Sequence, residues 1–293
     1  MPSSPLHQPI LDWYAKEGRE LPWREPGISP WGIMVSEIML QQTPVMRVEP
    51  VWLQWMSRWP TPAALAASAP GEAVHAWGRL GYPRRALRLH AAAMAIVQRY
   101  DGDVPDTPAD LLALPGVGIY TAAAVSAFAF GQRATVVDTN VRRVFARIIV
   151  GAARAAPSLT RAEMDAASGL VPQAAEDART WGAAVMELGA LVCRARTPRC
   201  SACPVHDLCA WQQANYPAYQ GPTRRGQSWH GTDRQCRGAI LAVLRGAEKP
   251  VIAAKVAAAW STDDTQRDRC LRSLVADGLV EPRVGNQFRL PGR

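Results

Sequence analysis

Apolar residues recur three and four positions apart along most of the chain, which is the spacing of helices that bury one face. The segments 63–67, 86–100 and 164–171 show this spacing clearly, and proline or glycine interrupts the pattern between segments. Alternation of the strand type is scarce before residue 279. The pattern therefore predicts a mostly α-helical fold, with one helical module over residues 1–211.

A different organisation is expected for the last part of the chain. A polar stretch at 212–235 predicts a linker, and a small domain at 236–293 would follow it. In that domain Gly285 and Asn286 separate two strand-like runs and predict a hairpin. Three short helices are expected before the hairpin, at 237–245, 251–260 and 266–277. This order is typical of a winged-helix-like domain, and a small helical appendage without a groove-reading role fits it equally well.

The composition indicates a soluble intracellular protein. With 293 residues the chain has room for about two domains, and 48% of its residues are hydrophobic. No apolar run reaches the roughly 18 residues of a membrane span, and residues 1–10 lack the basic and apolar regions of a signal peptide. We therefore expect a cytoplasmic location and no membrane association.

The excess of basic residues points to a polyanionic partner. The chain has 33 lysines and arginines against 25 aspartates and glutamates, a net charge of +8, and such cations gain affinity by displacing counterions from phosphates. A genomic bias toward arginine would give the same excess. Only three of the basic residues are lysines, namely Lys16, Lys249 and Lys255.

Four cysteines lie in one short stretch, with six, two and five residues between them: Cys193, Cys200, Cys203 and Cys209. Four thiolates from one loop can hold a cubane iron–sulfur cluster. A structural zinc site also takes four thiolates, but zinc ribbons usually present two matched C-x-x-C pairs and this stretch has one. The spacing favours a [4Fe–4S] cluster. Cys236 and Cys270 fall outside the run, and we interpret them as packing residues.

The segment 114–118, Leu-Pro-Gly-Val-Gly, lies between two helical segments at 110–113 and 120–129. Gly116 and Gly118 would let the backbone turn tightly, so that amides at the start of the second helix face a phosphate. The segment therefore predicts the hairpin of a helix–hairpin–helix motif.

Two carboxylates stand out by their surroundings. Glu37 lies in an otherwise apolar helical segment, 34–40, and a buried glutamate has a raised pKa suited to acid catalysis near neutrality. A glutamate on the exposed face of the helix is the alternative. Asp138 ends an apolar run, and taken alone it is better explained as a helix N-cap.

Together these motifs resemble those of the MutY-type adenine DNA glycosylases in the endonuclease III superfamily. The resemblance runs from about residue 21 to Cys209, in the order S-E-x-M-L-Q-Q-T, L-G-Y, L-P-G-V-G-x-Y-T, V-D-x-N and the cysteine loop. It implies a two-lobed helix–hairpin–helix glycosylase fold with DNA bound between the lobes. The six-helix lobe would span about 25–135, and the iron–sulfur lobe would combine 1–24 with 136–211.

The resemblance also implies a reaction and the residues for it. Glu37 would protonate the departing adenine, and Asp138 would stabilise the oxocarbenium-like sugar, which is the two-carboxylate logic of glycoside hydrolysis. Tyr120 and Asn140 match positions that orient this pair. The expected function is excision of adenine mispaired with 8-oxoguanine or guanine, the first step of base-excision repair.

Double-stranded DNA carrying such a mispair is the partner that the resemblance implies, and we expect a monomer acting at the nucleoid. The target base must leave the stack before it can react. Gln42 matches the residue that fills the vacated space, with Thr43 and Leu80 beside it. Gly116 and Gly118 of the hairpin match positions that contact the DNA backbone.

Some features depart from the family pattern. Thr139 and Pro83 replace a glycine and a tyrosine, and the region after Cys209 is too short for the MutT-like domain that recognises 8-oxoguanine in many members. The lysine that forms a Schiff base in endonuclease III-type lyases is also missing, because Tyr120 takes its place and no lysine lies between Lys16 and Lys249.

We therefore expect a monofunctional glycosylase without efficient strand cleavage. A thymine or uracil glycosylase acting on mispairs with guanine is the first alternative. A non-catalytic, iron–sulfur DNA-binding protein is the second.

Overall fold

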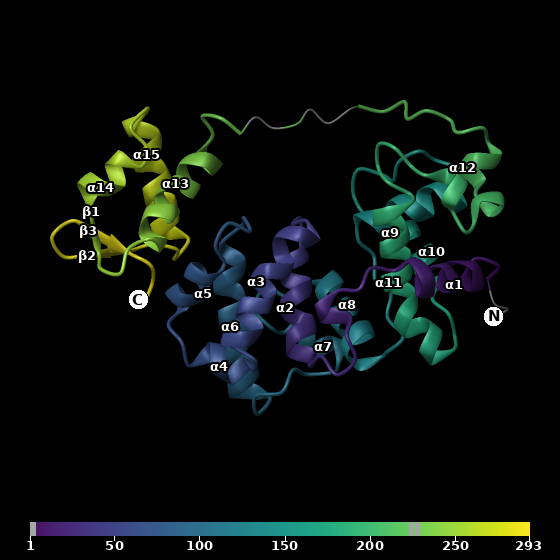
Figure 1. Ribbon diagram of the computed structural model, residues 1–293, viewed down its shortest axis with the longest axis horizontal. Coiled ribbons are helices and arrows are strands. Elements are labelled where there is room, and N and C mark those ends of the chain that lie inside the picture. The colour runs from purple at the N-terminus through teal and green to yellow at the C-terminus, as the bar shows by residue number, and fades with distance from the viewer. Residues whose placement is uncertain (1–3, 223–225, 227–228) are drawn as a thin grey trace. The chain divides into compact units, whose positions relative to one another are not determined.

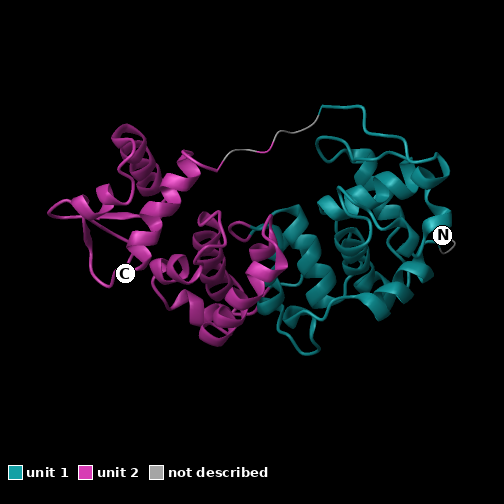
Figure 2. Ribbon diagram, turned by 45° about the horizontal axis from the view of Figure 1, so that its top comes forward, with its two compact units in different colours: residues 1–37, 105–113, 117–222 teal, residues 38–104, 114–116, 223–293 magenta. Residues whose placement is uncertain are grey.

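The computed structural model describes residues 4–222, 226 and 229–293. Residues 1–3 of the predicted helical module, and 223–225 and 227–228 of the predicted linker, lie outside the described residues. The chain divides into two compact units, coloured separately in Figure 2. Unit 1 comprises 1–37, 105–113 and 117–222, and unit 2 comprises 38–104, 114–116 and 223–293. These two units are not the lobes and C-terminal domain that the sequence predicts, because they are defined by contacts between residues. The predicted domain boundaries therefore stay a prediction.

Unit 1 is helical, as the sequence predicts. Helix α2 begins in this unit and ends just inside unit 2. The helices are α1 (His7–Glu17), α2 (Pro30–Leu40), α7 (Pro108–Leu112), α8 (Ile119–Phe130), α9 (Thr139–Phe145), α10 (Arg161–Gly169), α11 (Ala175–Leu191) and α12 (Ala210–Gln213). Shorter turns are the 3-10 helices η1 (Pro22–Arg24), η3 (Cys200–Ala202) and η4 (His206–Leu208), and the π-helix η2 (Ala146–Val150) that continues α9.

Helix α11 is the centre of unit 1, with α1, α8 and α9 packed against it (Figure 1). Ile10 of α1 and Leu188 of α11 are fully buried in the shared core. Two glycines make close packing possible on α11. A Cβ atom at Gly182 would lie 3.2 Å from Val136, and one at Gly189 would lie 2.7 Å from the Cβ atom of Asn140. The lack of side chains at these positions therefore lets the 136–140 segment lie directly against α11.

A buried carboxylate ties the N-terminal segment to the same helix. Glu187 of α11 is 1% exposed and accepts hydrogen bonds from Arg19, at 2.5 and 3.1 Å, and from Arg24, at 3.0 Å. These two guanidinium groups lower the pKa of Glu187 against the opposing effect of its burial. The carboxylate is therefore charged at neutral pH and fixes the start of the chain to α11.

Unit 2 contains the remaining helices and a small sheet. Its elements are α3 (Val45–Arg58), α4 (Pro62–Ala66), α5 (Pro70–Ala76), α6 (Arg84–Arg99), α13 (Asp233–Arg245), β1 (Val251–Ile252), α14 (Ala253–Ala258), α15 (Asp264–Ala276), β2 (Glu281–Arg283) and β3 (Gln287–Arg289). Helices α4 and α5 both pack on α6. The rings of Trp55 and Trp77 meet edge to face, 5.6 Å apart, and both side chains are fully buried.

The C-terminal part of unit 2 contains the three predicted helices, followed by the predicted hairpin of β2 and β3. The short strand β1 was not predicted. It pairs with β3, so the antiparallel sheet has the order β1-β3-β2. Gly285 and Asn286 have positive φ angles of 79° and 54°, but the hairpin loop also includes Val284 and is one residue longer than predicted. Whether these elements act as a winged helix stays a prediction.

This C-terminal part packs on α5 and α6. The backbone N–H of Gly71 donates to the carbonyl of Pro291 at 2.7 Å, and Arg245 donates to the carbonyl of Val74 at 3.0 Å. Arg84, at the start of α6, lies 3.3 Å from a carboxylate oxygen of Asp277. These contacts lie on the two helices that flank residues 77–83.

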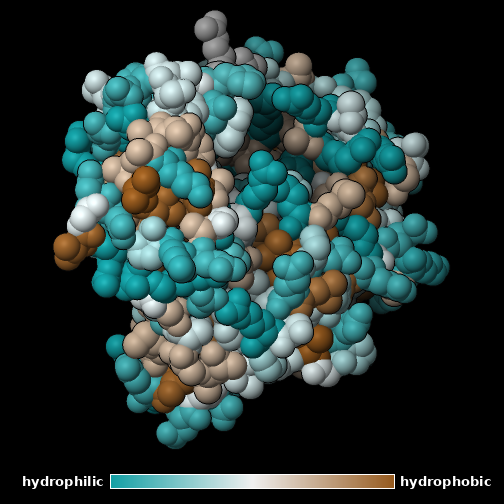
Figure 3. All heavy atoms as spheres, turned by 60° about the vertical axis from the view of Figure 1, so that its left-hand side comes forward, coloured by the Kyte–Doolittle hydropathy of each residue, from teal (hydrophilic) through white to brown (hydrophobic). Residues whose placement is uncertain are grey.

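Cys236 and Cys270 are buried in the packing between α13 and α15, as the sequence analysis expects. The view in Figure 3 shows a surface where hydrophilic side chains predominate and hydrophobic ones gather only in small groups. Among the described residues, no helix is both long enough and apolar enough to cross a membrane.

Candidate active site and iron–sulfur loop

Glu37 lies inside α2, whose sequence is apolar on all sides, and only 5% of its surface is exposed. The hydroxyl of Tyr120 in α8 donates a hydrogen bond of 2.7 Å to its Oε2 atom. Burial raises the pKa of Glu37 to about 7, although this hydrogen bond and the charge of Arg24 act in the opposite direction. The structure therefore brings together two of the predicted site residues and gives the carboxylate the raised pKa expected for it.

Asp138 is the N-cap of α9, as its position in the sequence suggested. Its Oδ1 atom accepts hydrogen bonds from the backbone amides of Asn140, at 2.8 Å, and Val141, at 2.7 Å. Its Oδ2 atom accepts one from the side-chain amide of Asn140 at 2.7 Å. Burial nevertheless raises the pKa of Asp138, and its negative charge contributes to the raised pKa of Glu37. The capping role and a chemical role are therefore compatible in one side chain.

Asn140 is held in turn by Arg143, which the sequence analysis missed. The Nη2 group of Arg143 donates to Oδ1 of Asn140 and to the carbonyl of Gly189, both at 2.7 Å, and its Nε donates to the carbonyl of Cys193 at 2.8 Å. A continuous set of hydrogen bonds thus runs from Asp138 to the first residue of the cysteine loop.

The four cysteines of the loop line one pocket, together with Arg147 and Trp211. Four thiols from one loop that line one pocket are a ligand set that suits an iron–sulfur cluster.

Arg147 places a positive charge beside this loop. It is 3% exposed, and its Nη1 group lies 3.3 Å from Sγ of Cys193 and donates to the carbonyl of Arg194 at 2.8 Å. The indole of Trp211 covers the guanidinium at 4.6 Å. This cation stabilises negative charge on the cysteine sulfurs.

The predicted hairpin joins α7 to α8. Gly116 has a φ angle of 81°, and a Cβ atom there would lie 2.7 Å from that of Arg88, so only glycine fits. Gly118 is the N-cap of α8, has no side-chain cap, and has no described atom within 4 Å of its Cβ position. The start of α8 therefore carries no side chain at its N-cap, and a helix N-terminus of this kind can bind a phosphate.

The three residues predicted to contact the base stack differ in exposure. Gln42 is exposed and has a left-handed backbone with a φ angle of 55°. Thr43 and Leu80 are buried, and the hydroxyl of Thr43 donates to the carbonyl of Leu80 at 3.4 Å. Tyr82 is 54% exposed and has a φ angle of 46°, so it accompanies Gln42 as a second exposed side chain on a left-handed backbone.

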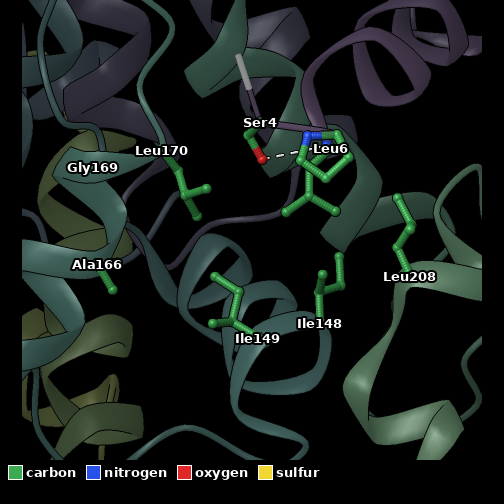
Figure 4. A pocket seen from close by; sticks show the side chains of 9 residues that line it. Ser4, Leu6, Ile148, Ile149, Ala166, Gly169, Leu170 and Leu208 are labelled. Atoms are coloured by element: carbon green, nitrogen blue, oxygen red, sulfur yellow. Dashed lines mark hydrogen bonds between the residues drawn. The ribbon is translucent and has the colours of Figure 1, made fainter. Parts of the chain in front are cut away.

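A larger pocket of about 480 Å³ lies elsewhere in unit 1, between the start of the chain, η2 and α10 (Figure 4). Its lining is apolar except for Ser4, whose hydroxyl oxygen accepts a hydrogen bond of 3.3 Å from the amide of Leu6. No lining residue can transfer a proton near neutral pH or bind a metal ion, so this pocket is not the candidate active site.

Comparison with known proteins agrees with this site. Residues 35–167 match the HhH-GPD superfamily of base excision DNA repair proteins. Residues 193–209 match the iron–sulfur binding domain of endonuclease III, which identifies the group held by the cysteine loop as an iron–sulfur cluster.

Curated relatives extend the similarity over nearly the whole chain. An adenine DNA glycosylase of Mycobacterium tuberculosis is 55% identical over 97% of this chain and 92% of its own length. One from Mycolicibacterium smegmatis is 52% identical over 97% of this chain and 95% of its own length. Among solved structures, a thermostable thymine-DNA glycosylase is 29% identical with a TM-score of 0.63, covering 70% of this chain and 94% of its own. The chain therefore belongs to the adenine DNA glycosylase family, within the HhH-GPD superfamily of base excision DNA repair proteins.

Proposed function

We propose that this enzyme hydrolyses the N-glycosidic bond of adenine paired with 8-oxoguanine or guanine in double-stranded DNA. The observation that carries the proposal is a pair of carboxylates: the buried Glu37 has a pKa raised to about 7, and the half-buried Asp138 is fixed by three hydrogen bonds. The 55% identity to an adenine DNA glycosylase supports adenine as the target.

Glu37 acts as the acid in this proposal. Adenine is a poor leaving group, so it must gain a proton as the bond to the sugar breaks. A carboxyl group whose pKa is near 7 is still partly protonated at neutral pH and can give up that proton readily. Tyr120 orients the group through its 2.7 Å hydrogen bond.

Asp138 stabilises the positive charge that develops on the sugar, or traps the sugar covalently. Asn140 keeps its carboxylate in place through the side-chain amide, and Arg143 keeps Asn140 in place. Once adenine has left, Glu37 has lost its proton and can act as the base that delivers water to the sugar.

We propose that the enzyme acts as a monomer on nucleoid DNA in the cytoplasm. Backbone amides and arginines would bind the DNA. Gly116 shapes the hairpin, and the first backbone amides of α8, after Gly118, would receive a phosphate. Gln42 would enter the base stack once the target base has flipped out. Thr43 and Leu80 are buried, so we expect them to support the loop that carries Gln42.

The four cysteines are the proposed cluster ligands. Cysteine sulfurs bind iron as thiolates, because coordination to a metal ion removes the thiol proton. The bound [4Fe–4S] cluster would supply a rigid connection among Cys193, Cys200, Cys203 and Cys209 and hold the loop in one shape. The role proposed for this loop is therefore architectural.

The enzyme would not cleave the strand itself. Schiff-base chemistry needs an amine at the sugar, and Tyr120 stands where endonuclease III-type lyases have their lysine. Unit 1 contains Lys16 as its only lysine in the described residues, on the exposed side of α1.

A single-turnover assay on duplexes with one A:8-oxoG, A:G, T:G or U:G pair tests the proposal, with products separated before and after alkali. We expect adenine release opposite 8-oxoguanine and guanine, and strand scission only after alkali. Asp138→Asn should abolish release, whereas the matched control Asp165→Asn, at a carboxylate that is 71% exposed, should not. Release of thymine or uracil alone would move the enzyme to the mismatch glycosylases that act on guanine pairs. Release of no base by a cluster-loaded protein would overturn the proposal.

A further inference from the structure

Arg85, in the first turn of α6, is a buried cation without a carboxylate partner. Its side chain is 7% exposed, and it forms no ion pair with any acidic residue that the structure describes. Its Nε group is one of the few buried polar groups in the described structure that lack a hydrogen-bond partner. Burial of an unpaired guanidinium is unfavourable, so other groups must compensate its charge.

Backbone carbonyls provide that compensation. Nη1 of Arg85 donates to the carbonyls of Ile38, at 3.0 Å, and Met39, at 3.3 Å. Both carbonyls belong to the last turn of α2, where the carbonyl groups have no partner within the helix and the helix dipole favours a positive charge. Arg85 therefore caps the C-terminal end of α2.

The same guanidinium also holds the loop that follows α2. Nη1 donates to the carbonyl of Gln41 at 2.5 Å, and Nη2 to the hydroxyl of Thr43 at 3.3 Å. These two acceptors lie on either side of Gln42, whose left-handed backbone at a φ angle of 55° is unusual for a residue with a side chain. A conformation of this kind persists only where its neighbours are fixed.

A second loop is attached to the same group. Nη2 of Arg85 lies 3.4 Å from the carbonyl of Gly81, and the guanidinium lies over the ring of Tyr82 at 5.1 Å. The indole N–H of Trp77 donates to the carbonyl of Gly81 as well, at 2.9 Å. One side chain thus joins the loop that carries Gln42 to the loop that carries Tyr82.

We propose that Arg85 is a positioning residue that holds residues 41–43 and 80–82 in one arrangement, and that discrimination between base pairs depends on it. The inference rests on the proposed function, since it takes Gln42 as a residue that enters the base stack. It extends that function by coupling Gln42 to Tyr82. Arg85 itself is too buried to contact DNA.

Arg85→Lys tests this coupling, because an ammonium keeps the charge but cannot reach acceptors on both loops from one planar group. Binding is measured for two duplexes that carry a 2′-fluoro adenosine, which is not hydrolysed, opposite 8-oxoguanine or opposite thymine. We divide the Kd for the duplex with thymine by the Kd for the duplex with 8-oxoguanine. We expect this Kd ratio to fall by about tenfold or more in the variant, since misplacement of positioning groups has effects of this size. A 2-aminopurine beside the target should also lose its unstacking signal.

The matched control is Arg84→Met, which removes a neighbouring arginine that is 56% exposed and paired with Asp277. Its Kd ratio should stay within about twofold of the parent value, which is the usual extent of changes at exposed residues. Cluster absorbance and circular dichroism identify any loss of folding. If Arg85→Lys does not fold, Gly81→Ala replaces it, because that glycine has a φ angle of 84° with open space around its Cβ position, so alanine strains the loop without a clash.

An unchanged Kd ratio in folded Arg85→Lys or Gly81→Ala would overturn the inference. Because these measurements use binding, they remain decisive even if the parent protein releases no adenine. That second result would overturn the proposed function alone. A lower ratio with an unchanged pH profile of adenine release would support the inference, since a catalytic defect at Glu37 would alter that profile.

Discussion

Glu37 is a carboxyl group removed from water, and its chemistry follows from this. The carboxyl group is almost fully buried, and the pKa is raised to about 7 mainly by loss of solvent. Tyr120 donates a hydrogen bond to this carboxylate, but the effect of burial on the pKa outweighs this stabilisation of the charged form. Glu37 can therefore donate a proton near neutral pH.

The pH dependence of adenine release should report this pKa. In the proposed mechanism the protonated form of Glu37 is active, so the single-turnover rate should fall about tenfold per pH unit well above pH 7. Tyr120→Phe removes a hydrogen bond that lowers the pKa of Glu37. The descending limb of the plot of rate against pH should therefore move to higher pH. A limb that stays in place, or moves to lower pH, would contradict this account of the site.

The same burial should make Glu37 unfavourable for stability. Between pH 4.5 and about 7 the folded protein binds a proton that the unfolded chain has released, so stability decreases as pH rises through this window. Above pH 7 the cost is on the order of 3 kcal/mol. Glu37→Gln should remove it, and urea unfolding should find the variant more stable at pH 8 but not at pH 4.5. The control Glu20→Gln, at an exposed position, should change neither value, and an equal gain at both pH values would refute the explanation.

At the scale of elements, the contact between α9 and α11 decides where Asp138 and Asn140 lie. Gly189 allows the two helices to approach so closely that its missing Cβ atom would lie 2.7 Å from Asn140. Asn140 in turn donates to Asp138. A change in helix packing is therefore transmitted directly to the site.

Gly189→Ala should separate α9 from α11 and displace both residues. We expect a loss of about 1–3 kcal/mol in unfolding free energy, as overpacking in a core usually costs, together with a lower rate of adenine release. Gly169→Ala is the control, because no described atom lies within 4 Å of the Cβ position at that helical glycine. Chemical denaturation and single-turnover rates measure both effects. A Gly189→Ala enzyme with the parent rate would show that the distance between the helices does not set the site.

Much of the arrangement of helices and of the site residues that they carry could be predicted from the sequence. The hairpin between α7 and α8, the burial of Glu37 and the N-cap at Asp138 follow from local spacing and residue type. The strand β1 could not be predicted, because two residues give no periodicity. Its residues Val251 and Ile252 also pair with a strand, β3, that lies far from them in the sequence. The π-helix η2 is likewise set by packing.

The arginines of the site were missed for a different reason. Arg85, Arg143 and Arg147 all donate to backbone carbonyls that lie far away in the sequence. Every residue has a carbonyl, so no motif marks these acceptors. In an arginine-rich chain these three side chains look like any surface cation until the fold is known.

At the scale of the whole molecule, unit 2 combines a segment before the hairpin with the C-terminal end of the chain. The contact of Gly71 with Pro291 is central to this arrangement, because the N–H of Gly71 donates across it and a Cβ atom would lie 2.5 Å from the Pro291 oxygen. Arg293 and Glu72 pair beside it at 2.6 Å. The C-terminal part is therefore packed on α5 through specific contacts.

Gly71→Ala should release this contact. Hydrogen exchange measured by mass spectrometry should become faster in residues 287–293, while α11 keeps its protection, because only the docked segment loses hydrogen bonds. Gly238→Ala, in the middle of α13, is the control, since no described atom lies within 4 Å of its Cβ position. Unchanged exchange at the C-terminal end would mean that the remaining contacts hold it without Gly71.

The pairing of α1 with α11 has a consequence for synthesis of the protein. Arg19 and Glu187 are 168 residues apart in the sequence, and at about 5–20 residues per second a ribosome needs roughly 10–30 s to make the segment between them. During that time Ile10 lacks the α11 residues, such as Leu188, that share its core. Helix α1 thus completes its packing only after α11 has been made, and a chaperone that binds nascent chains could bind α1 in the meantime.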